Sequence, residues 1–311
     1  FGARRRSWGE TAERIARIAG GLRSLGLKEG DRVAMLALNS DRYFEFFFAT
    51  SWAGLVFVPI NIRLAPPEFI HWLSDSGSRA LIVDETFAPA VPQLTPHLPA
   101  LDTLIFAGDG AAPQGMTAFE ALAGHGAVEP SARAGDDLAG LFYTGGTTGL
   151  SKGVMLSHGN IVHNAMIGAA HFGFGAPKSY LHAAPMFHIA DGACSFGVTL
   201  SGGAHHFISA FTPDGALQVL EADRIQSALM VPTMVNMIVS APGAEDRDLS
   251  AFETLVYGAS PMPEAVLRRA MTLMPNSRFF QAYGQTECAP VLTALPPERH
   301  VFDGPLAGKA G

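Results

Sequence analysis

Short apolar runs alternate with helical segments along almost the whole chain, and this alternation restricts the fold more than any other feature. The apolar runs lie at 33–38, 56–60, 80–83, 103–106, 139–143, 180–184, 226–231, 254–257 and 278–282. Strands that alternate with helices are typical of βαβ units, which build mainly parallel sheets. Strands that are apolar throughout are typical of sheets covered on both faces. The sequence therefore predicts an α/β fold of stacked, mixed but mainly parallel sheets with interleaved helices.

The chain has 311 residues, which suits two domains or one large one. Ser7 and Glu10 form the S-x-x-E pattern of a capping box, which predicts a first helix that ends before Gly26. Residues 108–137 are rich in Gly, Ala and Pro and have no clear period. We interpret them as a loop-rich connection between an N-terminal α/β subdomain, 1–137, and a second α/β subdomain, 138–311.

Charge and composition exclude several classes of protein. Lys and Arg total 21 and Asp and Glu total 28, so the net charge of −7 argues against nucleic-acid binding. The longest nearly apolar stretch, 46–60, is shorter than the ~20 residues of a membrane-spanning helix, and we expect no stable membrane span. Two cysteines, Cys194 and Cys288, are too few for a disulfide scaffold and fit a reducing compartment, so a cytoplasmic location is expected.

The strongest local signal is a glycine- and threonine-rich segment directly after an apolar run. Residues 141–153 are LFYTGGTTGLSKG. Glycines let the backbone approach a ligand closely, while hydroxyl and backbone N–H groups donate to anionic oxygens. Lys152 adds positive charge, although its neighbours do not match the GK[ST] ending of a Walker A loop. We interpret the segment as a phosphate-binding loop; the alternative is a flexible Gly-Thr turn.

A second polar segment, QAYGQTE at 281–287, follows another apolar run. Tyr283 offers a ring on which a planar base can stack. Glu287 stands at a strand end, where open α/β sheets bind ligands, and a carboxylate near phosphates usually acts through Mg²⁺. The alternative is an ordinary helix N-terminus with Thr286 as its cap.

Two further segments follow predicted strands. PMFHIA at 185–190 places His188 at an apolar strand end, where a histidine of the core is the alternative. VYGASPMP at 256–263 predicts a tight turn, or simply a strand-to-helix connection. The methionines between 230 and 237 indicate a helix that lines the core or a pocket, where they would suit an acyl-binding wall.

Taken together and in this order, the four segments resemble the adenylate-forming superfamily of acyl- and aryl-CoA synthetases, luciferases and peptide-synthetase adenylation domains. YTGGTTGLSKG resembles the phosphate loop, PMFHIA the carboxylate-side motif, YGASPMP the adenine-side turn, and YGQTE the adenine and magnesium motif. The resemblance covers most of the chain and implies the layered αβαβα N-terminal domain of that family. Such enzymes join a carboxylate to ATP, release pyrophosphate, and pass the acyl group to a thiol, usually coenzyme A.

The resemblance also implies roles by position. The β- and γ-phosphates would be held by Thr144, Gly145, Gly146, Thr147, Thr148, Gly149 and Lys152. The adenine would be framed by Gly258, Ala259, Ser260, Gln281, Ala282 and Tyr283. His188, Gly284 and Gln285 would border the carboxylate and the acyl pocket, and Thr286 and Glu287 would act at the α-phosphate, Glu287 through Mg²⁺. The catalytic set so implied is Thr144, Lys152, His188, Thr286 and Glu287.

The segment around His188 separates subclasses of that family. Amino-acid-activating members usually carry an Asp in this motif, whereas here Asp191 lies beyond His188, so we expect a substrate without an α-amino group. Residues 291–300, VLTALPPERH, resemble fatty-acyl-CoA ligases more than luciferases. We therefore expect an ATP-dependent acyl-CoA synthetase for a fatty acid. An aryl, hydroxycinnamate-type CoA ligase, a carrier-protein-loading acyl-AMP ligase and a non-catalytic nucleotide- or acyl-binding module are the alternatives.

The implied cofactors are ATP, Mg²⁺ and coenzyme A, and the implied partner is a small-molecule carboxylic acid. A homodimer is left open as the assembly. We expect the smaller C-terminal domain of the family, with its hinge and adenylation lysine, to be absent from these 311 residues.

Overall fold

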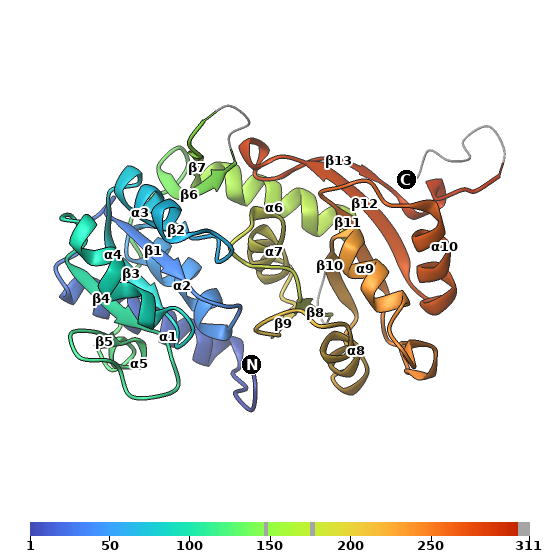
Figure 1. The fold of residues 1–311 in the computed structure, drawn as a ribbon, viewed down its shortest axis with the longest axis horizontal. Coiled ribbons are helices and arrows are strands. Elements are labelled where there is room, and N and C mark those ends of the chain that lie inside the picture. Colours follow the sequence, from blue (N-terminus) through green and yellow to red (C-terminus); the bar gives the residue numbers. More distant parts are fainter. Residues whose placement is uncertain (146–148, 175–177, 304–311) are drawn as a thin grey trace. The chain divides into compact units, whose positions relative to one another are not determined.

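The computed structural model describes residues 1–145, 149–174 and 178–303. The chain forms two compact units that divide between Asn160 and Ile161 (Figure 1). Each unit is built around its own sheet, and short helices connect the strands. The predicted α/β class, with mixed, mainly parallel sheets and interleaved helices, is confirmed.

The sheet of the first unit has seven strands in the order β5-β4-β3-β1-β2-β6-β7. They are β1 (Arg32–Leu36), β2 (Val56–Pro59), β3 (Ser78–Val83), β4 (Thr103–Phe106), β5 (Thr117–Ala118), β6 (Leu138–Thr144) and β7 (Lys152–Ser157). All neighbours pair in parallel except β6 and β7, which form an antiparallel hairpin. The inner strands are buried along almost their whole length, as the continuous apolar runs predicted.

The helices of the first unit are α1 (Trp8–Ser24), α2 (Asp41–Trp52), α3 (Pro66–Asp75), α4 (Val91–Leu94) and α5 (Phe119–Leu122), with 3₁₀ turns at Ala88–Ala90 and Thr95–His97. The predicted capping box of α1 is confirmed: Ser7 Oγ accepts from the Glu10 backbone N–H, and the Glu10 carboxylate accepts from the Ser7 N–H. Prolines open α3, which packs against β3 and α4, whereas α2 packs against β1 and β2.

The second unit holds a six-stranded sheet in the order β13-β12-β11-β10-β8-β9. Its strands are β8 (Ser179–His182), β9 (Ala204–Phe207), β10 (Ser227–Met230), β11 (Thr254–Gly258), β12 (Arg278–Gly284) and β13 (Val291–Leu295). Its helices are α6 (His158–Phe172), α7 (Ile189–Leu200), α8 (Pro213–Ala222), α9 (Pro232–Val239) and α10 (Glu264–Leu273), with 3₁₀ turns at Ala244–Asp246, Thr286–Cys288 and Pro297–Arg299. Only β13 runs antiparallel, against β12.

The structure differs from the sequence prediction at the division of the chain. The predicted boundary lay after residue 137, but β6 and β7 continue the first sheet through the pairing of β6 with β2. Residues 138–157 therefore belong to the first compact unit. A functional division into 1–137 and 138–311 stays a prediction.

Among the residues that the structure describes, no helix combines the length and the apolar character needed to cross a bilayer.

Candidate functional site

The predicted phosphate loop joins β6 to β7 in the first unit. Thr144, the last residue of β6, pairs with Lys152, the first residue of β7, so the two lie opposite each other at the base of the loop. Lys152 is exposed and has no ion pair among the described residues. Gly145 and Gly149 are exposed too. The predicted ligands Gly146, Thr147 and Thr148 lie outside the described residues.

Helix α3 fixes the point where this loop re-enters the sheet. Trp72 Nε1 donates to Ser151 Oγ at 2.5 Å, and His71 Nε2 lies 3.0 Å from the Ser151 carbonyl oxygen. The Trp72 ring stacks on Tyr143 with centroids 4.6 Å apart, and the Tyr143 hydroxyl donates to Asp75 at 2.6 Å. Side chains of α3 thus fix Ser151, the residue before Lys152. The sequence alone does not predict this contact.

In the second unit, β11 and β12 end at glycines that no other residue can replace without a shift of the backbone. A Cβ on Gly258 would lie 2.0 Å from the Ala282 carbonyl oxygen, and one on Gly284 would lie 1.9 Å from that of Pro290. Directly after Gly258, Ala259 adopts a φ of 67°, a left-handed conformation that is uncommon for a residue with a Cβ. Backbone strain of this kind clusters at ligand sites. The predicted turn at 258–260 is therefore an irregular strand end, at which Gly258 is buried and Ala259 and Ser260 are exposed.

Glu287 lies in the turn between β12 and β13. Thr286–Cys288 form a single 3₁₀ turn after Gln285, which makes no side-chain cap, so the alternative of an α-helix capped by Thr286 is wrong. The Glu287 side chain is exposed and makes no ion pair among the described residues. Its charge is therefore free to face a ligand.

Asn164 on α6 holds this turn from behind. Its Nδ2 donates to the carbonyl oxygens of Cys288 and Val291 at 3.0 Å each, and its Oδ1 accepts from the Val291 N–H at 3.2 Å. The side chain is only 6% exposed, so these bonds form away from water. One buried amide thus fixes both ends of the segment that follows Glu287.

His188 begins α7 as its N-cap residue. Its Nδ1 accepts from the Ala190 N–H at 3.2 Å, which leaves the proton of the neutral ring on Nε2. The ring lies at an exposed position, but neighbouring residues remove enough of its water to lower the His188 pKa, against the opposing charge of Asp191. A neutral ring with an Nε2–H is a hydrogen-bond donor suited to a carboxylate oxygen.

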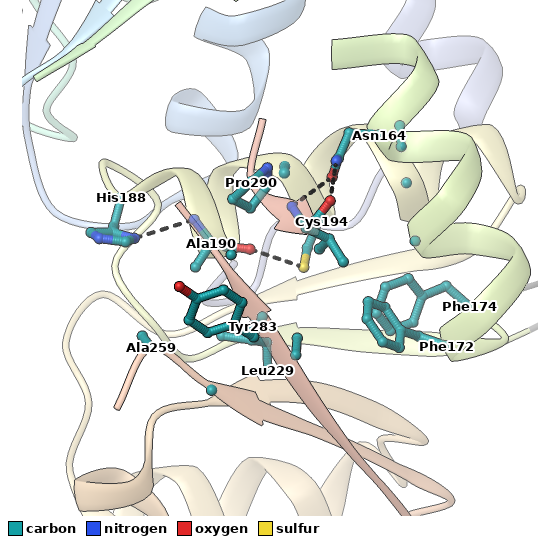
Figure 2. A pocket seen from close by; sticks show the side chains of 18 residues that line it. Asn164, Phe172, Phe174, His188, Ala190, Cys194, Leu229, Ala259, Tyr283 and Pro290 are labelled. Atoms are coloured by element: carbon teal, nitrogen blue, oxygen red, sulfur yellow. Dashed lines mark hydrogen bonds between the residues drawn. The ribbon is translucent and has the colours of Figure 1, made fainter. Parts of the chain in front are cut away.

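A pocket opens beside these residues, entirely within the second unit. Its cavity volume is about 80 Å³. Figure 2 shows His188 and Tyr283 toward one side of the pocket and Phe172 and Phe174 on the opposite side. The lining residues are Asn164, Ala165, Gly168, Phe172, Phe174, His188, Ala190, Ala193, Cys194, Gly197, Leu229, Gly258, Ala259, Ala282, Tyr283, Gly284, Pro290 and Val291.

The predicted residues of the second unit thus gather around one pocket. His188, Gly258, Ala259, Ala282, Tyr283 and Gly284 line it directly. Ser260, Gln281, Gln285, Thr286 and Glu287 neighbour them in sequence without lining it. The residues of the phosphate loop belong to the first unit, and their convergence with this pocket stays a prediction.

Asp191 does not face the pocket. Its carboxylate is fully buried and accepts from the Tyr180 hydroxyl at 2.8 Å, and it lies 2.7 Å from Nδ1 of His182. His182 in turn lies 2.9 Å from His205. Asp191 is therefore engaged in the core and is not placed to pair with a substrate ammonium.

The proposed methionine wall is wrong for this pocket. Met230 and Met234 are buried in the core of the second unit, and the described pocket lining contains no methionine. Much of the remaining wall comes from α6 and α7, which the sequence motifs do not indicate. The only signal for them was the helical spacing of small residues at 190, 193, 194 and 197 and of Asn164, Gly168 and Phe172.

For a metal ion, the candidate site offers a single carboxylate, that of Glu287. Among the described residues, no three His, Cys, Asp or Glu side chains gather as a metal site would require. Mg²⁺ is commonly held by one or two carboxylates together with substrate phosphates, so the exposed Glu287 fits such an ion.

Known proteins are similar to this chain over most of its length. The family model described as AMP-binding enzyme matches residues 1–310. A feruloyl-CoA synthase from Amycolatopsis sp is 35% identical over 294 residues, which cover 93% of this chain and 56% of that protein. The fatty acid–[acyl-carrier-protein] ligase ScoC of Streptomyces coeruleorubidus is 33% identical over 95% of this chain and 56% of its own length. The chain thus spans about half the length of these curated relatives.

Solved structures share the fold. A Mycobacterium tuberculosis fatty acyl CoA synthetase superposes with a TM-score of 0.86 at 28% identity, over 97% of this chain and 58% of that one.

Proposed function

Because the chain belongs to the AMP-binding enzyme family, we propose that it carries the nucleotide- and acyl-binding part of an ATP-dependent acyl-CoA synthetase. The reaction activates a carboxylic acid as acyl-AMP, with release of pyrophosphate, and then transfers the acyl group to coenzyme A. The observation that carries this proposal is an apolar pocket lined by Tyr283, Gly258 and Ala259, with the exposed carboxylate of Glu287 four residues after Tyr283 in the chain.

The roles that we propose for the site residues follow from the negative charges of the two substrates. An acid anion and ATP repel each other, so the site must neutralise charge where the two meet. Lys152 and Thr144, at the base of the glycine-rich loop, are assigned to the β- and γ-phosphates. Glu287 is assigned to Mg²⁺, which would shield the phosphate oxygens when bound, and Thr286 donates its hydroxyl toward the α-phosphate.

His188 is assigned to the carboxylate of the acid. Its Nδ1 is occupied by the Ala190 N–H, and the remaining Nε2–H can donate to a carboxylate oxygen and orient it. Loss of surrounding water lowers the His188 pKa and keeps the ring neutral near pH 7. The ring therefore orients the attacking carboxylate through a hydrogen bond and not as a cation in an ion pair. The exposed ring of Tyr283 and the strained turn at Ala259 are assigned to the adenine.

A fatty acid is the proposed substrate, and an aryl acid is the alternative. The relatives include a feruloyl-CoA synthase and a fatty-acid ligase that loads a carrier protein, so each alternative has a named counterpart. Coenzyme A is the proposed acceptor; a carrier protein is the second candidate because of the 33% identity to ScoC. A cytoplasmic location and a homodimer stay predictions.

The test is acid-dependent ATP–pyrophosphate exchange by the full-length gene product, with Glu287→Ala as the variant. Loss of one preorganised electrostatic group should lower exchange by ~100-fold or more. The matched control is Glu298→Ala, an exposed carboxylate in the 3₁₀ turn Pro297–Arg299, which should leave exchange unchanged. Normal exchange in Glu287→Ala would remove Glu287 from its assigned role, and nucleotide binding without any exchange in the wild type would favour the non-catalytic module.

A further inference from the structure

Two helices of the second unit present small residues to the pocket from facing sides. From α6 come Ala165 and Gly168, and from α7 come Ala190, Ala193, Cys194 and Gly197. In each helix these residues recur at helical spacing and so share one face. The parts of the pocket wall that α6 and α7 supply through these residues therefore carry little side-chain volume.

The backbone does not require glycine at either helical position. Neither residue has a positive φ. A Cβ on Gly168 would meet only Phe172 Cδ2, at 3.9 Å, and a Cβ on Gly197 would lie 3.5 Å from the Ala165 carbonyl oxygen and 3.9 Å from Phe174 Cδ2. These are ordinary van der Waals distances. Glycine within a helix is less favourable than alanine, so both positions forgo stability that a methyl group would supply without a clash.

Two aromatic rings close the pocket at the side opposite His188. Phe172 and Phe174 are almost fully buried, with ring centroids 5.7 Å apart. Edge-to-face contacts fix both rings from behind: Phe280 packs on Phe172 at 5.6 Å, and Tyr180 packs on Phe174 at 5.3 Å. The end wall is thus packed into the core, and a longer ligand cannot displace it without disturbing that core.

The polar groups near this end are already engaged. The Cys194 thiol donates to the Ala190 carbonyl oxygen at 3.3 Å. Both Nδ2 protons of Asn164 are used by the turn after Glu287, and its Oδ1 accepts from Val291. Among the described lining residues, the remaining polar side chains are His188 and Tyr283, which lie toward the other side (Figure 2). Within the described part of the lining, no uncommitted polar side chain stands at the far end to pair with a hydroxyl group of a ligand.

We propose that this pocket selects a carboxylic acid with a pure hydrocarbon tail, and that Gly168 and Gly197 set the length of tail that fits. The proposal rests on the proposed function, because it takes the pocket as the place where the acid is bound for activation. It excludes tails with a polar far end: a buried hydroxyl without a partner should weaken binding of the acid by ~10- to 100-fold.

The experiment combines two variants with two series of acids. Gly168→Ala and Gly197→Ala each add one methyl group to the pocket wall. Straight-chain acids from butyrate to palmitate measure tail length, and cinnamate against coumarate measures the penalty of a ring hydroxyl. Binding of each acid by calorimetry and acid-dependent pyrophosphate exchange are measured side by side on the full-length protein. The matched control is Gly9→Ala, a helical glycine of α1 in the first unit whose added Cβ would have only Ser7 Oγ nearby, at 4.0 Å.

We expect both pocket variants to bind the longest accepted acids ~10-fold or more weaker than the wild type does, because each methyl takes the place of about one methylene of the tail. The shortest acids should bind as before, and the thermal midpoint should rise rather than fall, which excludes misfolding as the cause. Gly9→Ala should leave the acid series unchanged. Cinnamate should bind more tightly than coumarate to the wild type.

An unchanged length preference in both pocket variants would overturn the role of the glycines. Coumarate that binds as tightly as cinnamate would overturn the hydrocarbon-tail selection. Acids that bind with the expected preferences but support no exchange would leave the pocket assignment standing and refute the proposed reaction instead. Acids that do not bind the wild type at all would refute the pocket assignment.

Discussion

Asn164 offers a direct test of how the segment after Glu287 is held in place. Asn164→Leu keeps the number and branching of the side-chain heavy atoms but removes three hydrogen bonds, two to carbonyl oxygens and one from the Val291 N–H. The net contribution of one hydrogen bond to the free energy of unfolding is ~1 kcal/mol, and a buried polar group left without a partner costs more. For the three bonds together, the expected loss of unfolding free energy is ~3 to 5 kcal/mol. Because the variant loses no side-chain heavy atoms, it should create no cavity that lowers stability further.

Urea unfolding followed by circular dichroism measures this loss, as a lower midpoint with an unchanged slope. Hydrogen exchange of the Val291 amide reports on the turn itself and should become faster in the variant. His163→Ala, a change at the exposed neighbour on the same helix, is the control and should leave both readouts as they are. A loss of stability below ~1 kcal/mol, about the contribution of a single hydrogen bond, would refute the reasoning that Asn164 anchors this turn.

Two further predictions concern the loop base and the buried histidines. Trp72→Phe keeps the aromatic stack but removes the hydrogen bond to Ser151. The KM for ATP in pyrophosphate exchange should therefore rise by a factor of ~3 to 10, which corresponds to the free energy of one hydrogen bond. An unchanged KM would show that the loop does not need this contact. Burial, together with the neighbouring His182, lowers the pKa of His205 well below its ordinary value of 6.5. As the pH drops below 6.5, the unfolded chain therefore binds a proton at this residue before the folded chain does. The free energy of unfolding should then fall by up to ~1.4 kcal/mol per pH unit until the pKa of the folded state is reached. Urea unfolding between pH 7 and pH 5 should show a shallower fall in His205→Gln but not in His125→Ala, an exposed histidine, and equal slopes in all three proteins would contradict this.

The strands at the centre of each sheet could be predicted from the sequence because burial on both faces leaves a continuous apolar run. The expected runs at 103–106 and 254–257 coincide with β4 and β11 to within a residue. The antiparallel partners β7 and β13 were missed because they are only partly buried and carry no such run. The compact units divide after residue 160, later than the predicted subdomain boundary, since β7 ties residues up to 157 to the first sheet.

The motifs of the candidate site could be predicted because their chemistry depends on short stretches of backbone. Gly258 and Gly284 allow neighbouring backbone segments to approach closely. Because this requires glycine at those positions, the sequence itself indicates it. The walls of the pocket could not be predicted in this way. They arise where one face of α6 meets one face of α7, and spacing within either helix does not say what that face packs against. Asp191 illustrates the same limit, because its engagement with Tyr180 and His182 depends on tertiary contacts.

The measurement that tests the central claim most directly is acid-dependent ATP–pyrophosphate exchange by the full-length gene product, with a panel of fatty and aryl acids. We expect exchange with acids that carry a hydrocarbon tail, a lower rate with hydroxylated aryl acids, and a ~100-fold loss in Glu287→Ala. Measurable ATP binding without exchange for any acid of the panel would contradict the assignment of this site to carboxylate adenylation.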